Sequence, residues 1–361
     1  MIEEFPLENN DYENANDKAE EIRKPTIAQV SALYSFGVIL LLYIGSRAQR
    51  VNVIPWGILI TEFILILIPS LALLLIYKYN IMRVLRLNKI SFLNSFIVMC
   101  IAGFAIPVVT ALNLVNLMVI KSLFGKVILP ATPMPGGSYG LLISILAIGA
   151  APGICEEIMF RGVILRGFER YGIYKGILIT AFLFGLMHLD FQKLLGTFLL
   201  GALIGFVVYR TNSIFAGMIA HFTNNSAIVL LTYGLGKLQE IINKSGLDKA
   251  KGFGSAESSD KAISTLMNLP RAQLIAVLVF YGFIFLFFLA GLVGLIMGLI
   301  KNTSVKNEKV SIETRNVSKK SFLWLAPGLL LIAFIYLAKG FSLGGIHSIL
   351  IKDIARLIGL T

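Results

Sequence analysis

The sequence predicts an all-α, polytopic helical membrane protein with about eight or nine transmembrane helices. Three observations support this prediction. Of the 361 residues, 57% are hydrophobic and only 14% are charged, whereas a soluble domain carries roughly 25% charged residues. The mean hydropathy is +0.81, so a soluble fold could not hide its apolar surface from water. The apolar residues also form runs of about 20, the length that a helix needs to cross a bilayer.

This composition excludes several other classes of protein. The net charge of +12 would suit a nucleic-acid binder, but the cations lie between the apolar runs, where they act as topology signals. The two cysteines, Cys100 and Cys155, form no CxxC or zinc-knuckle pattern. We therefore expect a lipid bilayer around the protein and no nucleic-acid partner.

Residues 1–26 precede the first apolar run and are polar and acidic. Eight of the 20 acidic residues lie within the first 24 positions. A segment of this composition cannot bury enough apolar surface to fold, so we expect a disordered acidic tail. It lacks the basic start, apolar core and small-residue cleavage site of a signal peptide.

Nine apolar segments are candidates for membrane spans. The third contains Pro107, where we expect a kink or a break, and the fifth is short, which suits a helix buried among others. The nine cover residues 28–46, 54–77, 92–120, 139–162, 173–189, 194–209, 213–233, 272–300 and 321–338.

The spans divide the chain into regions. The tail after Gly345, which includes His347, alternates apolar and charged residues as a helix lying in the membrane interface does. We expect N-terminal membrane helices over 27–138, a helical core over 139–233, a polar loop over 234–271, and C-terminal helices with this interfacial tail over 272–361.

The loops predict the orientation in the cell membrane. The loops after the second, fourth and eighth spans are the most basic, and the positive-inside rule places them in the cytoplasm. The N-terminus is then cytoplasmic and, with nine spans, the C-terminus lies outside. The basic residues are Lys78, Arg83, Arg86, Lys89, Arg166, Arg170, Lys175, Lys301, Lys306, Lys309, Arg315, Lys319 and Lys320.

Ionisable groups at membrane depth are costly, so each is a candidate for function. Only three carboxylates fall inside the apolar runs: Glu62, Glu156 and Glu157. Glu62 lies near the outer end of its span, and we expect an interfacial position there. Two of the three histidines, His188 and His221, lie in spans or at their ends.

The paired carboxylates have different neighbours. On a helix Glu156 and Glu157 point about 100° apart, so they cannot share one role. Glu157 precedes Arg161 by four residues, the favourable order for an ion pair. This pair is either a buried salt bridge or one in which Arg161 extends to the membrane surface. Glu156 has no local cation and is suited to act as a general base.

Together with the histidines, Glu156 suggests a hydrolase. Glu156 would take a proton from water that His188 holds. His221 and Asn225, four apart and on one helical face, would donate hydrogen bonds to the oxyanion of a tetrahedral intermediate. Glu156, His188 and His221 also form a possible zinc ligand set, although no HExxH spacing is present. We interpret Cys155 as a buried apolar residue, because no charge on its own face would activate it as a nucleophile.

The motif set resembles the CAAX protease and bacteriocin-processing (CPBP) family of intramembrane endopeptidases. Their pattern is EExxxR, then FxxxH, then HxxxN or HxxxD, on successive helices. Residues 139–233 contain the three motifs in this order, as Glu156-Glu157-xxx-Arg161, Phe184-xxx-His188 and His221-xxx-Asn225.

The resemblance implies a helical fold around a conical, water-filled intramembrane cavity. It implies that Glu156 and His188 activate water. His221 and Asn225 would stabilise the oxyanion, while Glu157, Arg161 and Phe184 would support the site. It further implies a membrane-anchored or hydrophobic peptide as substrate.

We therefore expect an intramembrane endopeptidase that uses glutamate-activated water and no cofactor. A zinc enzyme with Glu156, His188 and His221 as ligands is the alternative mechanism. The alternative function is a non-catalytic membrane scaffold, or a bacteriocin-immunity or regulatory protein, with the same fold. A transporter would predict an inverted repeat, which the sequence lacks. The residues identify no particular substrate and no oligomeric state.

Overall fold

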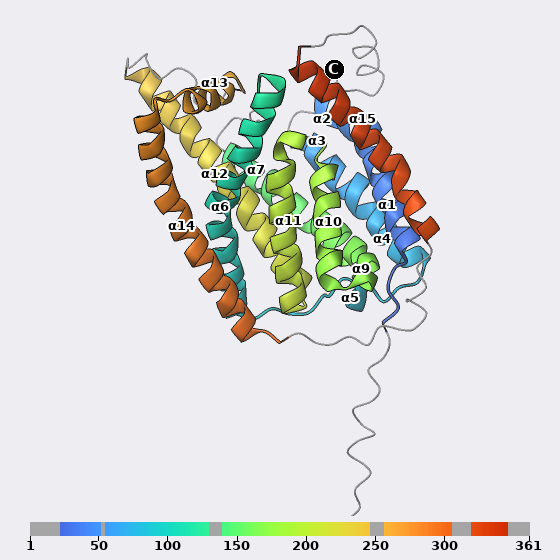
Figure 1. The fold of residues 1–361 in the computed structure, drawn as a ribbon. Helices are drawn as coiled ribbons and strands as arrows, with labels where there is room; N and C mark the ends of the chain where they lie inside the picture. The colour runs from blue at the N-terminus through green and yellow to red at the C-terminus, as the bar shows by residue number, and fades with distance from the viewer. Residues whose placement is uncertain (1–21, 52–54, 130–138, 246–255, 305–318, 346–361) are drawn as a thin grey trace, which may run out of the picture.

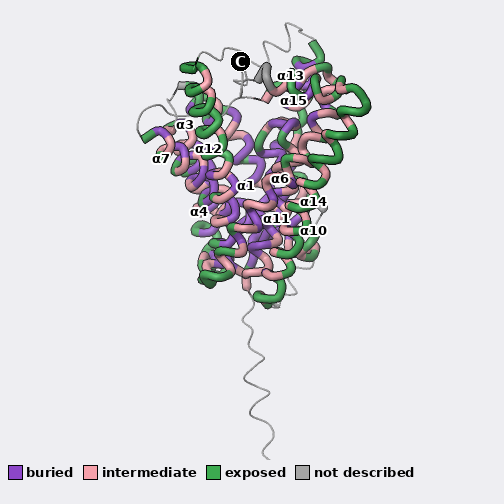
Figure 2. The backbone as a smooth tube through the Cα atoms, turned by 90° about the vertical axis from the view of Figure 1, so that its left-hand side faces the viewer, coloured by how far each residue is buried: buried purple, intermediate pink, exposed green. Residues whose placement is uncertain are grey.

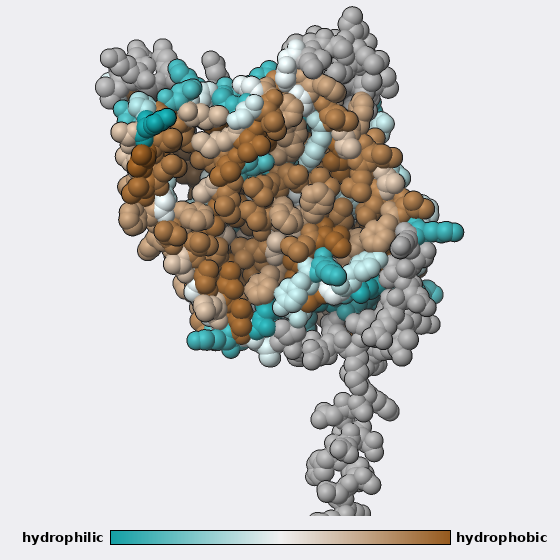
Figure 3. Space-filling model, in the orientation of Figure 1, coloured by the Kyte–Doolittle hydropathy of each residue, from teal (hydrophilic) through white to brown (hydrophobic). Residues whose placement is uncertain are grey.

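The computed structural model of the protein describes residues 22–51, 55–129, 139–245, 256–304 and 319–345. Within these ranges the chain is helical and contains no β-strand. Eight helices are long and apolar enough to cross a membrane, which confirms the predicted polytopic all-α fold. Figure 1 shows these helices as one bundle, and Figure 3 shows a broad apolar belt between two more polar ends.

The eight spans agree with eight of the nine predicted segments. The predicted fifth span is the shorter helix α10, Ile173–Met187. Its 15 residues reach about 22 Å, less than the roughly 30 Å of a bilayer core. The eight spans are Ile27–Arg50, Trp56–Ile76, Phe92–Phe124, Gly140–Tyr171, Phe191–Thr211, Ile214–Lys244, Arg271–Asn302 and Lys320–Leu343.

Three of the spans contain π-helical segments, which are frequent at functional sites. The first span consists of α1 (Ile27–Leu40), the π-helical η1 (Leu41–Gly45) and α2 (Ser46–Val51). The second consists of α3 (Trp56–Leu59), the π-helical η2 (Ile60–Leu67) and α4 (Ile68–Ile76). The fourth consists of α7 (Gly140–Ser144), the π-helical η3 (Ile145–Ala150), α8 (Ala151–Glu157), the π-helical η4 (Ile158–Ile164), α9 (Leu165–Phe168) and the 3-10 turn η5 (Glu169–Tyr171).

The other spans are more regular. Helix α6 is continuous through Pro107, so the expected break does not occur. It ends at Gly125, whose φ of 79° is the left-handed conformation that glycine adopts without cost. The remaining elements are α5 (Ile81–Val84), α6 (Phe92–Phe124), α11 (Phe191–Thr211), α12 (Ile214–Lys244), α13 (Ala256–Met267), α14 (Arg271–Asn302), the 3-10 turn η8 (Lys319–Leu325) and α15 (Ala326–Leu343).

The segment expected as a polar loop, 234–271, is largely helical where it is described. Helix α12 continues to Lys244, and α13 forms a separate helix. Glu240 pairs with both Lys237 and Lys244 at helical spacing, a pattern that supports a solvated helix. The sequence therefore located this polar segment correctly, but the prediction that it forms a loop was wrong. The acidic tail before residue 22 and the tail with His347 lie outside the described residues.

Buried residues form two main apolar clusters inside the bundle (Figure 2). One joins α1, α10 and α15 to the region around η4, and the other joins α6, α11, α12 and α14. Helices α10 and α11 approach closely at Gly201, where an added Cβ would lie 3.2 Å from Ala181 Cα and 3.2 Å from the ring of Phe184. The segment 139–233 contributes residues to both clusters.

Candidate active site

Glu156 and His188 line the same pocket, which has a volume of about 260 Å³. The pocket lies between the first two spans, the α8–η4 region and the C-terminal end of α10. Its walls include Glu62, Glu156, Phe160, Phe184, His188 and Leu189. Two residues that are 32 positions apart in the sequence are therefore brought together, as a shared role in activating water requires.

Glu157 lies behind this pocket and is completely buried. Its Oε1 accepts hydrogen bonds from Arg161 Nη1 at 2.7 Å and is 2.8 Å from His221 Nδ1. Arg161 Nη2 donates to the carbonyl oxygen of Gly201 at 2.9 Å, and its guanidinium carbon lies 4.7 Å from the ring centroid of Phe184. The first of the two predicted readings of the Glu157–Arg161 pair, a buried salt bridge, is therefore the one that the structure shows.

His221 contacts both carboxylates of the pair. Its Nδ1 faces Glu157, and its Nε2 lies 3.7 Å from Glu156 Oε2. A carboxylate accepts only, so His221 Nδ1 carries a proton while Glu157 is ionised. This contact orients the ring and directs Nε2 toward Glu156.

His188 is the residue at which α10 ends. Its Nδ1 lies 2.9 Å from the carbonyl oxygen of Phe184. Because a carbonyl only accepts, Nδ1 donates, and Nε2 of the neutral ring is left as an acceptor. The His188 ring packs edge-on against Phe184, with 4.9 Å between the ring centroids. The imidazole is thus held at two points and its Nε2 is suited to hold a water molecule.

Of the four predicted catalytic residues, His221 and Asn225 are not among those that line the pocket. Asn225 Nδ2 donates to the carbonyl oxygen of Ile148 in η3 at 3.0 Å. This hydrogen bond joins α12 to the fourth span.

The comparison with protein families bears on this same part of the chain. Residues 138–227 match the family described as Type II CAAX prenyl endopeptidase Rce1-like. This segment is therefore similar to an Rce1-like CAAX prenyl endopeptidase domain. The match implies an intramembrane protease and confirms the resemblance predicted from the three motifs. No curated protein matched the chain, and no solved structure matched it.

The Rce1-like domain does not supply the whole pocket. Glu62, on η2 and outside the matched segment, is 6% exposed and lines the pocket together with Glu156. We expected an interfacial position for Glu62 and no part in a site; the structure instead shows its side chain buried against the pocket. Its carboxylate at membrane depth was a signal in the sequence, but an apolar span does not reveal which of its faces points inward.

The alternative zinc site would use Glu156, His188 and His221 as ligands. Within the parts of the chain that the structure describes, no group of three or more His, Cys, Asp or Glu side chains is arranged to hold a metal ion. The Nδ1 atoms of His188 and His221 face the Phe184 carbonyl and Glu157, which leaves Nε2 of each ring as the atom that could bind a ligand.

Proposed function

We propose that the protein is an intramembrane endopeptidase that hydrolyses a peptide bond of a membrane-anchored or lipophilic substrate with water activated by Glu156. The observation that carries this proposal is the shared pocket of Glu156 and His188. A water molecule held by His188 Nε2 would lie within reach of the Glu156 carboxylate. Its position between a base and an acceptor suits it for attack on a carbonyl carbon.

The chemical step follows from these positions. Glu156 takes one proton from water, and the remaining hydroxide forms a bond to the carbonyl carbon of the substrate. The C–N bond then breaks, and the amine leaves with the proton that Glu156 carries. The reaction consumes one water and produces one carboxylic acid and one amine. It needs no further reactant.

The developing oxyanion needs donors. In this proposal His221 is protonated at both ring nitrogens, so that it donates from Nδ1 to Glu157 and from Nε2 to the oxyanion. Asn225 is the second donor, since its amide has two N–H groups and the bond to Ile148 uses one of them. Glu157 and Arg161 act as positioning residues through His221 and Phe184.

We further propose that the end of the bundle with α5 and α9 faces the cytoplasm. In Figure 1 both helices lie at the end where α1 begins, opposite α2 and α3. Arg83 lies on α5 and Arg166 on α9, so the positive-inside rule assigns this end. The pocket is lined by Ser46 and Gln49 of α2, which places it toward the opposite end of the bundle.

The test is cleavage of membrane-inserted peptides by purified protein in lipid nanodiscs. Glu156→Gln and His188→Ala should each abolish cleavage, because each removes a group that activates water. Glu240→Gln is the control, since this residue is exposed at the end of α12. A non-catalytic scaffold predicts instead that Glu156→Gln keeps the full cellular phenotype, and that result would overturn the endopeptidase proposal.

A further inference from the structure

Glu62 is a buried acid whose hydrogen bonding is incomplete. Only 6% of the residue is exposed, and its Oε2 has no hydrogen-bond partner in the part of the chain that the structure describes. Leaving a buried carboxylate oxygen unpaired is costly. Because Glu62 lines the pocket of Glu156 and His188, a molecule that enters this pocket can supply the missing donor.

The neighbouring polar side chains do not supply that donor. Thr61 Oγ1 donates to the carbonyl oxygen of Gly57 at 2.9 Å, and Gln49 Nε2 lies 3.4 Å from Thr61 Oγ1. Both residues line the pocket beside Glu62. These two donors are therefore used elsewhere, and neither pairs with Oε2 of Glu62.

The charge of the pocket indicates which donor fits best. Two carboxylates, Glu62 and Glu156, line it, and among the described residues no lysine or arginine does. With a neutral N–H at Oε2, Glu62 and Glu156 could not both be ionised at low cost in a medium of low dielectric. A cation pairs the oxygen and offsets the charge, and such charge-assisted hydrogen bonds are the stronger ones.

The size of the pocket restricts the occupant further. A volume of about 260 Å³ is below the range of about 300–1,000 Å³ that holds a drug-sized molecule. The pocket therefore suits one extended side chain beside the reacting peptide bond. A lysine or arginine has an apolar stem that suits the apolar part of this lining, which includes Leu41 and Ile66, and a charged end that can pair with Glu62.

We propose that Glu62 determines specificity by binding a positively charged substrate side chain, lysine or arginine, close to the peptide bond that is cleaved. This inference rests on the proposed endopeptidase function. It assigns the second span, outside the Rce1-like domain, a part in choosing the substrate.

The first experiment measures specificity. Membrane-inserted peptides carry lysine or the uncharged, similarly shaped norleucine at one position at a time, and cleavage is followed in nanodiscs. At one position near the cleaved bond, the wild type should prefer lysine by at least about tenfold in kcat/KM. Glu62→Gln should reduce this preference to less than about twofold while norleucine peptides are still cleaved. Thr61→Val, which changes the same wall without changing its charge, should retain the preference.

The second experiment does not depend on cleavage. The Kd values of fluorescent lysine and norleucine peptides are compared for Glu156→Gln protein and for the Glu156→Gln, Glu62→Gln double variant. Tighter binding of the lysine peptide that disappears in the double variant supports the inference, even if the wild type cleaves nothing. Equal Kd values for both peptides in Glu156→Gln protein overturn it. Cleavage by the wild type with an unchanged lysine preference in Glu62→Gln also overturns it and leaves the endopeptidase function standing.

Discussion

Oε1 of Glu157 lies 2.8 Å from Nδ1 of His221, while the same oxygen accepts a hydrogen bond from Arg161. One atom therefore joins the α8–η4 region to α12 and connects the first sequence motif to the third. The contact turns Nε2 of His221 toward Glu156. Glu157 thus acts on the site through a histidine, and Glu156 faces the pocket itself.

The first prediction concerns the stability difference between these two glutamates. Glu157→Gln leaves Arg161 buried without its ionic partner, which typically costs about 3–5 kcal/mol. Glu156→Gln should change the free energy of unfolding by less than about 1 kcal/mol, because the Glu156 side chain is 16% exposed and carries no close ion pair with Arg or Lys among the described residues. Thermal unfolding in detergent micelles measures both variants. Equal midpoints would contradict this division of roles.

The second prediction concerns Asn225. If its amide supports the Ile148 carbonyl, Asn225→Asp should lower the free energy of unfolding by about 1–3 kcal/mol, because two oxygens then face each other. A residue that acted only on the oxyanion would leave stability unchanged. Unfolding is measured beside cleavage, with Thr232→Val, a half-buried position further along α12, as the control. An unchanged free energy of unfolding in Asn225→Asp would show that the hydrogen bond to Ile148 does not stabilise the fold.

The third prediction concerns the turn that follows His188. Leu189 has a φ of 54°, a conformation that costs a residue with a side chain about 1–2 kcal/mol. Lys339 Nζ on α15 donates to the Leu189 carbonyl oxygen at 2.6 Å. Lys339→Met should release this turn, displace His188 and lower kcat about tenfold with little change in KM.

Lys339→Arg should restore most of the activity, since it keeps a cationic donor. Lys193→Met is the matched control, because it removes an exposed positive charge from the first turn of α11. Equal activity of the Lys339→Met and Lys193→Met proteins would show that the contact with Leu189 does not position His188.

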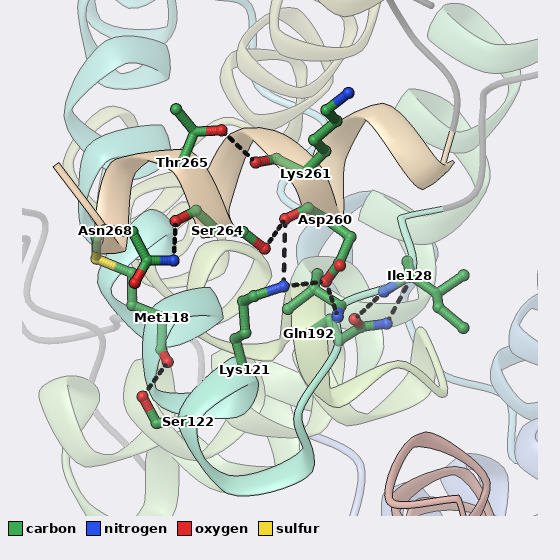
Figure 4. A network of polar contacts seen from close by, with 11 residues as sticks. Met118, Lys121, Ser122, Ile128, Gln192, Asp260, Lys261, Ser264, Thr265 and Asn268 are labelled. Carbon is green, nitrogen blue, oxygen red and sulfur yellow. Dashed lines mark hydrogen bonds and ion pairs between the residues drawn. The ribbon is translucent and has the colours of Figure 1, made fainter.

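The fourth prediction concerns pH and the docking of α13. Burial raises the pKa of Asp260, but hydrogen bonds from Lys121 and from the Val127 N–H lower it further, so the pKa lies below its ordinary value (Figure 4). A depressed pKa means that this stabilisation is present above the ordinary carboxyl pKa of about 3.8. It is lost as the pH falls through the lowered value.

Hydrogen exchange measures this effect. Amides of α13 should lose protection as the pH falls below about 3.8, and Asp260→Asn should lower their protection at neutral pH. Lys261→Ala, at an exposed position of the same helix, should leave it unchanged. Equal protection in the wild type and Asp260→Asn at neutral pH would show that this contact does not hold the helix.

The fifth prediction concerns orientation. In a background without the native cysteines, a cysteine at position 83 should resist labelling by impermeant reagents added to intact cells, because α5 lies at the basic end. A cysteine at position 240, at the far end of α12, should be labelled. The reverse pattern would invert the orientation and place the pocket toward the cytoplasm.

Much of the architecture follows from local properties of the chain. Runs of about 20 apolar residues predict spans whatever their neighbours are, and three motifs at helical spacing predicted the Rce1-like domain. The Glu157–Arg161 pair was predictable because both residues lie on one helix, four positions apart. Helix α13 was missed because its polar residues were interpreted as a loop. In the structure Asp260 on α13 accepts hydrogen bonds from Lys121 on α6 and from the N–H of Val127, which follows α6.

The sequence by itself determined a polytopic helical protein and which residues are chemically capable of hydrolysis. Only the tertiary structure decided that Glu62 shares the pocket, that His221 contacts both glutamates, and that Asn225 bonds to Ile148. The physical reason is that a membrane helix is apolar on all its faces, so no periodic pattern shows which face meets another helix. Contacts between residues far apart in the chain depend on the angles at which helices pack. They also depend on π-helical turns, which change the direction of side chains without any local sequence signal.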